Sequence, residues 1–335
     1  MQHDKNLCIC MGYESLVIPL KLMNEGKEVL VYSNRRDILK FCKFQKIPFI
    51  QGPIISSSKC ARFPNKVKSL ILKSLNGLDI QKHNIHVTHK AFGLHSLFMV
   101  FFAKETNVLF HKTEIDFEKS FSVPFFPFQN LKTNLKHIIS FWFLQRFQFL
   151  LNYGLFITYR YYLGTLIPIV KDKWIVENTK IVDYNGKFEF FFDTYLNFSV
   201  NVPICKNLFL FTDINEMSNY VDKESLMKIH ELIIGHDVTV KGHPNRNVKL
   251  DNVQQYPSFI PAEVLIAKTS NSVIGLSSTT LGYASFHEKI KSISFIDLVK
   301  WSDISKKNFF KDNLTKSGGK IVFPQTLQEL DNLLR

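Results

Sequence analysis

The chain has 335 residues, of which 45% are hydrophobic and 21% are charged, and its formal net charge at pH 7 is +13. This composition is typical of a globular protein and excludes a largely disordered chain. The length suits two domains of about 150 residues each. The positive charge favours an anionic partner, such as a nucleic acid, an anionic membrane surface or a phosphate-bearing substrate.

The cysteines and the hydropathy of the sequence indicate the cellular compartment that we expect for the protein. Its five cysteines are scattered and odd in number, so we expect free thiols in a reducing compartment and no disulfide framework. The amino terminus has no basic segment followed by a long apolar one, so no secretory signal is expected. No stretch of about 20 residues is apolar and uncharged, so the sequence predicts no membrane span.

The first half of the chain alternates between predicted strands and helices. The expected strands cover residues 6–12, 27–34, 47–52, 84–93 and 106–116. The expected helices cover residues 14–26, 35–46 and 56–76. Strands that alternate with helices in this rhythm indicate a parallel, doubly wound sheet.

The middle of the chain has a different character. Residues 132–170 are dense in aromatic side chains but contain Lys136, Arg146 and Arg160, which argues against a spanning helix. Two alternatives stay open: one or two helices packed on the domain, or an interfacial surface whose aromatics enter a membrane while its cations meet lipid phosphates. Residues 180–198 are expected to form a hairpin, with Asn185 and Gly186 as its turn.

The second half returns to the alternating pattern. Its expected strands cover residues 207–213, 236–244, 271–278 and 290–297. Its expected helices cover residues 223–235, 261–269, 279–287 and 325–335. We therefore expect two α/β domains, residues 1–198 and 206–335, with the segment 132–170 in the first.

Polar residues follow two of these strands, where open parallel sheets bind their ligands. His243 follows the run "DVTVKG" (237–242) and can donate to a phosphate or protonate a leaving group, although a histidine there can also be an ordinary loop residue. Ser277, Ser278 and Thr279 open a helix, where hydroxyls and backbone N–H groups favour an anion. Simple helix capping is the alternative for these hydroxyls.

Glu263 lies in the first turn of the predicted helix 261–269. An acid at this position can simply complement the helix dipole. Its alternative role is to accept hydrogen bonds from the hydroxyl groups of a ribose.

Three segments taken together, "KGHPN" (241–245), "YPSFIPAEVL" (256–265) and "VIGLSSTTLGYAS" (273–285), resemble bacterial sialyltransferases and polysialyltransferases of the GT-B type. The resemblance covers residues 206–297, and the first half matches that family only in architecture. It implies an α/β fold with two Rossmann-like domains facing across a cleft. It also implies transfer of a nonulosonic acid of the sialic acid type from a CMP-activated donor to a surface glycan, either lipooligosaccharide or capsule, at the cytoplasmic face of the inner membrane.

The resemblance also implies roles for individual residues. His243 would contact the donor phosphate and act as general acid, the three hydroxyls would hold the phosphate, and Glu263 would hold the ribose or the cytosine. Two glycines would let the nucleotide approach closely. The implied CMP site consists of Gly242, His243, Pro244, Glu263, Gly275, Ser277, Ser278 and Thr279.

The catalytic base is less clearly marked in the sequence. The family's Asp/Glu-Asp/Glu-Gly motif, which supplies the base, is missing here. The nearest substitutes by position are Asp116, which we prefer, and Glu114, although a solvated acidic loop explains both equally well. His89 and His111 are weaker alternatives, and Asp183 is assigned to the predicted hairpin turn.

The implied reaction is a direct displacement that needs neither a metal nor another cofactor. A CDP-glycerol or CDP-ribitol phosphotransferase is an alternative, but those proteins usually carry Asp-Tyr-Ser-Ser where this chain has Gly-Leu-Ser-Ser at residues 275–278. A Kdo transferase, which also uses a CMP-sugar, is a second alternative. Outside the enzymes, a basic protein that binds nucleic acid or lipid stays open, although no nucleic-acid recognition motif is present.

Overall fold

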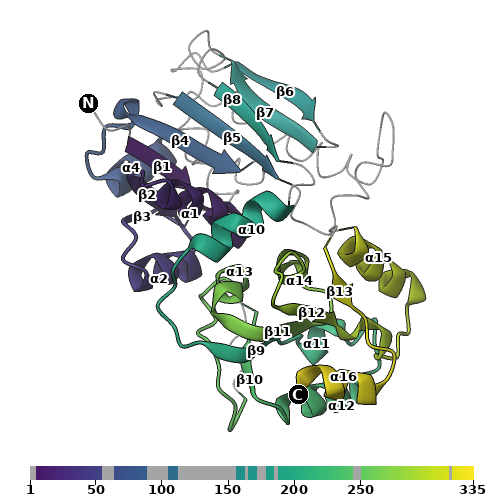
Figure 1. Ribbon diagram of the computed structural model, residues 1–335. Helices are drawn as coiled ribbons and strands as arrows, with labels where there is room; N and C mark the ends of the chain where they lie inside the picture. The colour runs from purple at the N-terminus through teal and green to yellow at the C-terminus, as the bar shows by residue number, and fades with distance from the viewer. Residues whose placement is uncertain are drawn as a thin grey trace. The chain divides into compact units, whose positions relative to one another are not determined.

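Figure 1 shows the computed structural model of the chain, which describes residues 5–54, 64–88, 105–111, 156–162, 165–171, 179–184, 188–243, 250–316 and 319–335. The described residues form two compact units, and the helix α10 (Phe188–Asn197) is the first element of the second unit. Across these residues, no helix is both long and apolar enough to cross a membrane.

The first unit is built on a six-stranded sheet with the order β3-β2-β1-β4-β5-β8, in which all neighbouring strands are parallel. Its strands are β1 (Lys5–Ile9), β2 (Val29–Ser33), β3 (Phe49–Gln51), β4 (His83–Thr88), β5 (Glu105–His111) and β8 (Thr179–Tyr184). Its helices are η1 (Tyr13–Leu16), α1 (Val17–Asn24), α2 (Arg36–Phe44), α4 (Pro64–Leu75) and η2 (Ile80–Lys82). The strand order reverses between β1 and β4, as in Rossmann-like sheets.

The local sequence explains why these elements form. Strands buried on both faces read as continuous apolar runs, and in β1 every residue after Lys5 is buried. Helix α2 buries Ile38, Phe41 and Cys42, which recur at helical spacing on one face. Gly26 follows α1 with a φ of +73°, a left-handed conformation that glycine adopts without strain.

The aromatic middle segment contains a hairpin. The strands β6 (Phe156–Tyr162) and β7 (Thr165–Lys171) pair antiparallel, so the helical prediction is wrong for this part. Its β-branched residues favour a strand, and Pro168 would interrupt a helix. Residues 132–155 lie outside the described residues, and the interfacial alternative stays a prediction.

The hairpin predicted for residues 180–198 is wrong. Strand β8 pairs with β5 in parallel, and α10 (Phe188–Asn197) is a helix. Asp183 therefore lies in a strand opposite Phe110, and not in a turn. The Asn-Gly pair suggested a turn between two strands, but tertiary packing outweighed this local signal.

Helix α10 packs on the second unit. The rings of Tyr195 and Tyr283 meet edge to face, with centroids 5.2 Å apart, and Phe192 meets His287 at 5.9 Å. The division between the units thus falls before α10, whereas the predicted first domain ran to residue 198.

The second unit has a five-stranded parallel sheet with the order β10-β9-β11-β12-β13. The strands are β9 (Cys205–Leu210), β10 (Val238–Lys241), β11 (Thr269–Gly275), β12 (Lys291–Ser294) and β13 (Ile321–Val322). The helices after α10 are α11 (Ile214–Met217), α12 (Lys223–Ile234), α13 (Ala262–Leu265), η4 (Ile266–Lys268), α14 (Thr279–Ala284), η5 (Phe295–Asp297), α15 (Ile304–Thr315) and α16 (Leu327–Leu334).

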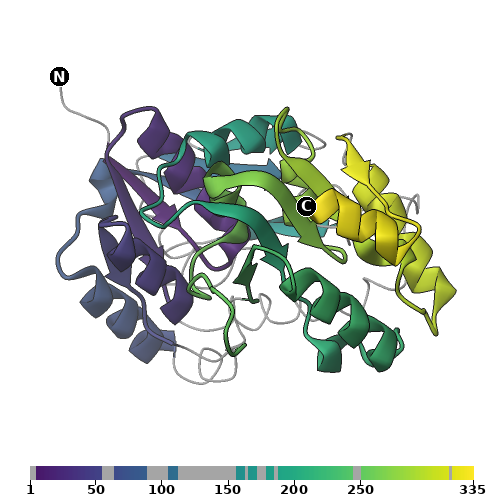
Figure 2. The same ribbon diagram turned by 60° about the horizontal axis from the view of Figure 1, so that its bottom comes forward.

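Helices cover both faces of this second sheet. In Figure 1, α12 and α16 lie below the sheet and α13 and α14 lie above it. Figure 2 shows the same sheet after rotation, with the carboxy-terminal helix in yellow. One core cluster joins Phe209 and Ile274 from the strands to Ile229 and Leu330 from the helices below. The α/β class with two Rossmann-like units, the domain make-up of GT-B proteins, is thereby confirmed.

Candidate functional site

The candidate site lies at the carboxyl end of the second sheet. The strand order reverses between β9 and β11, and open parallel sheets bind ligands beyond the strand ends at such a point. Strands β10 and β11 lie on either side of β9, so their ends are about 10 Å apart. Residues 242–243 follow β10 and residues 276–279 follow β11, so the structure brings the two predicted motifs to one edge.

The hydroxyl loop consists of Ser277, Ser278 and Thr279, which are all partly exposed. The Ser278 hydroxyl caps α14 by accepting a hydrogen bond from the Thr280 backbone N–H at 3.3 Å. Capping therefore accounts for Ser278. Helix α14 has only six residues, so the hydroxyls themselves, more than a helix dipole, would donate to an anion.

Glu263 lies beside the hydroxyl loop. The Thr280 hydroxyl donates to Glu263 Oε1 at 3.1 Å, which ties α13 to the start of α14. Thr280 is almost fully buried, whereas Glu263 is partly exposed. The predicted site residues did not include Thr280, and its only signal is that it extends the run of hydroxyl residues.

Lys241 is the last residue of β10, and it is buried with 3% of its surface exposed. Its ammonium donates to the carbonyl oxygens of Gly242 and Ser258, the latter at 3.1 Å. Burial lowers the pKa of Lys241 to about 8, and attraction to Glu263 opposes that shift. A lysine closing an apolar strand is the signal that could have identified it, because a buried lysine needs compensating partners.

His243 is exposed, two residues beyond the end of β10. An exposed ring at this position can meet a ligand that arrives at the carboxyl end of the sheet. Pro244, which was also predicted to belong to the CMP site, lies outside the described residues.

Gly275 is buried at the end of β11. A Cβ atom there would lie 3.2 Å from Leu210 Cβ and 3.6 Å from Leu281 Cδ1. Close packing of α14 against β9 and β11 therefore accounts for the glycine. Its predicted role in letting a nucleotide approach stays a prediction.

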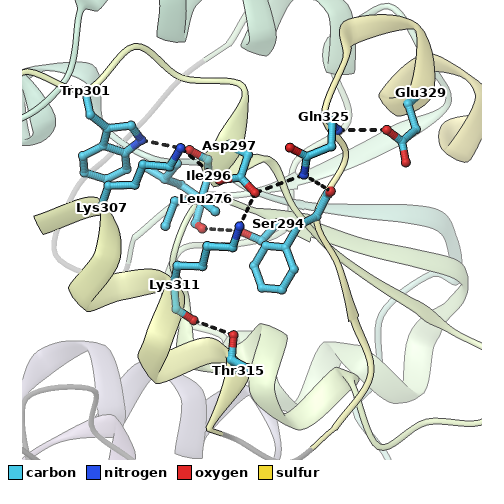
Figure 3. A network of polar contacts seen from close by, with 11 residues as sticks. Leu276, Ser294, Ile296, Asp297, Trp301, Lys307, Lys311, Thr315, Gln325 and Glu329 are labelled. Carbon is cyan, nitrogen blue, oxygen red and sulfur yellow. Dashed lines mark hydrogen bonds and ion pairs between the residues drawn. The ribbon is translucent and has the colours of Figure 1, made fainter. Parts of the chain in front are cut away.

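A polar network lies around the end of β12 and reaches Leu276, the residue before the hydroxyl loop (Figure 3). Ser294 at the end of β12 donates to the Leu276 carbonyl at 2.7 Å. Asp297 follows, and it accepts hydrogen bonds from Lys307 (3.0 Å), Lys311 (2.5 Å) and Gln325 (3.2 Å). Burial alone would raise the pKa of Asp297, but these three donors hold it below its usual value.

The sequence offered four candidates for the catalytic base, namely Asp116, Glu114, His89 and His111. Glu114, Asp116 and His89 lie outside the described residues, so their roles stay predictions. His111 is the last residue of β5, at the carboxyl end of the first sheet.

No family model matches the chain, and no curated protein matches it. Among solved structures, the chain is similar to an α/β-galactoside α-2,3-sialyltransferase from Photobacterium phosphoreum, with 13% identity over 93% of this chain and 95% of that chain and a TM-score of 0.37. It is similar to the calicheamicin glycosyltransferase CalG4, with 11% identity over 100% and 89% of the two chains and a TM-score of 0.46. It is also similar to an Anabaena protein solved with UDP and glucose, with 12% identity over 99% and 89% and a TM-score of 0.39. The two-unit fold follows from the two parallel sheets described above.

Proposed function

We propose that the protein is a GT-B-type glycosyltransferase that transfers a sialic-acid-type nonulosonic acid from a CMP-activated donor to a surface glycan, either lipooligosaccharide or capsule. The observation that carries the proposal is the gathering of His243, Glu263 and the hydroxyl loop at one edge of the second sheet. A nucleotide needs donors for its phosphate and an acceptor for its ribose, and this edge offers both.

The donor phosphate would be held by the hydroxyl loop. Preorganised donors stabilise charge that develops on a leaving group, because they need no reorganisation during the reaction. Glu263 already accepts one hydrogen bond from Thr280, and a carboxylate has further lone pairs with which to accept ribose hydroxyls.

The reaction we propose is one displacement. The acceptor hydroxyl oxygen forms a bond to the anomeric carbon, while the bond from that carbon to the phosphate oxygen breaks and CMP leaves with the electron pair. His243 protonates the departing phosphate, and a carboxylate removes the acceptor's proton. Asp116 is the proposed base, with Glu114 as the alternative.

We also propose that this chemistry takes place at the cytoplasmic face of the inner membrane. The support is the formal net charge of +13, which would attract an anionic lipid surface. Binding to vesicles of anionic lipid that weakens as salt is added would support this placement. Equal binding to neutral vesicles would count against it.

Nucleotide binding tests the proposal directly. CMP should raise the melting temperature, since a ligand at 100 times its Kd stabilises the folded state by about 2.7 kcal/mol. UMP and AMP serve as controls. A CMP-activated sialic acid should then release CMP faster when candidate glycan acceptors are added.

The other candidates predict different results. Turnover of CDP-glycerol or CDP-ribitol would favour the phosphotransferase, and turnover of CMP-Kdo alone would favour the Kdo transferase. Salt-sensitive binding of DNA or lipid with no effect of CMP would overturn the enzyme proposal in favour of a basic binding protein.

A further inference from the structure

The buried ammonium of Lys241 has no role in the proposed chemistry. Burying a charge is costly unless hydrogen bonds and opposite charge compensate for it. Here the compensation comes from the carbonyls of Gly242 and Ser258 and from the attraction of Glu263. These three partners belong to two segments, residues 241–243 and residues 254–263, and each segment contributes residues to the candidate nucleotide site.

The two segments are already joined along the edge of the sheet. Strand β10 pairs with the segment that follows residue 250, because Val240 N–H donates to Gln254 O at 2.8 Å and Tyr256 N–H donates to Val240 O at 2.9 Å. This backbone pairing ends at Tyr256. Beyond it, the Lys241 side chain makes the next contact, to Ser258.

Lys241 and Ser258, which this contact joins, are both close in the chain to candidate site residues. Gly242 is the residue before His243. The chain from Ser258 runs through Pro261 into α13, whose first turn holds Glu263. A shift between these segments would therefore change the separation of His243 and Glu263.

We propose that Lys241 is a positioning residue, whose ammonium holds residues 242–243 against residues 256–261 and thereby sets where Glu263 stands. That these residues bind a nucleotide rests on the proposed function, whereas the link between the segments does not. A lysine that merely stabilised the fold would change the free energy of unfolding without selectively loosening these two segments.

The test compares Lys241→Met and Lys241→Gln with a matched control. Methionine keeps most of the length of the side chain and removes its donors, and glutamine keeps a neutral donor if the methionine variant does not fold. Lys206→Met is the control, because Lys206 also donates to a backbone carbonyl, that of Arg335 at 3.0 Å, but lies near the other end of the sheet on β9.

Hydrogen exchange without nucleotide is the first measurement. Both Lys241 variants should exchange about tenfold faster in peptides covering residues 254–266, equal to about 1.4 kcal/mol, and the Lys206 variant should match the wild type there. Unchanged exchange in these peptides, or equally faster exchange throughout the second unit, would overturn the inference.

CMP affinity by calorimetry is the second measurement. The Lys241 variants should bind CMP about tenfold more weakly than the wild type, and Lys206→Met should bind within about twofold of it. Wild-type affinity in Lys241→Met would refute the positioning role. If the wild type itself binds no CMP while the exchange result holds, the proposed function fails and the link between the segments stands.

Discussion

His230 in α12 tests whether the core of the second unit buries a neutral imidazole ring. Its ring lies among three phenylalanines, with centroid distances of 4.7 Å to Phe211, 5.3 Å to Phe209 and 6.1 Å to Phe295. Only 4% of the residue is exposed, and neither ring nitrogen has a hydrogen-bond partner among the residues the structure describes. Burial lowers the pKa of His230 to about 4, so the ring is neutral at pH 7.

The sign of the pH effect follows from this lowered pKa. Between the ordinary pKa of 6.5 and the folded value of about 4, the unfolded chain binds a proton that the folded protein does not. Acid therefore favours unfolding in this range. The full difference corresponds to about 3 kcal/mol, and about 2 kcal/mol of it is lost by pH 5.

Replacing His230 with leucine or phenylalanine removes the titrating group and keeps the position apolar. Urea denaturation at pH 7.5 and pH 5 gives the free energy of unfolding for each protein. Between these two pH values, the wild type should lose about 2 kcal/mol more than either variant. If all three proteins lose the same free energy, His230 is not buried as a neutral ring.

Three further predictions concern the packing of Gly275, the role of His243 and the identity of the catalytic base. Gly275→Ala should lower the free energy of unfolding by about 1–3 kcal/mol, because the added Cβ would lie 3.2 Å from Leu210 Cβ, and thermal melting measures the change. His243→Ala should cut turnover by about 100-fold or more while circular dichroism stays native, since the residue is exposed; near-normal turnover would remove it from the mechanism. Asp116→Asn or Glu114→Gln should abolish transfer and leave calorimetric CMP binding intact, and if neither does so, the base is another residue.

The strands and helices that the sequence predicted correctly have strong local signals. In β9 and β11 the apolar runs are buried in a parallel sheet, and in α12 Leu226, Ile229 and Ile233 recur at helical spacing. Helix α15 went unpredicted because it has no such signal: Leu314 alone of its residues is buried. The aromatic segments that form β6, β7 and α10 were misassigned, since aromatic side chains suit strands, helices and hairpins alike until their packing partners are known.

The alternation of strands and helices, and hence the parallel sheets, can be read from the residues alone, and so can the position of His243 and the hydroxyl loop at strand ends. Which polar groups become partners depends on how the chain folds. Lys241 reaches a carbonyl 17 residues away, and Thr280 reaches Glu263 across an equal separation. Such pairs depend on how whole segments pack, because a side chain's burial and reach are properties of the surrounding fold and not of its neighbours along the chain.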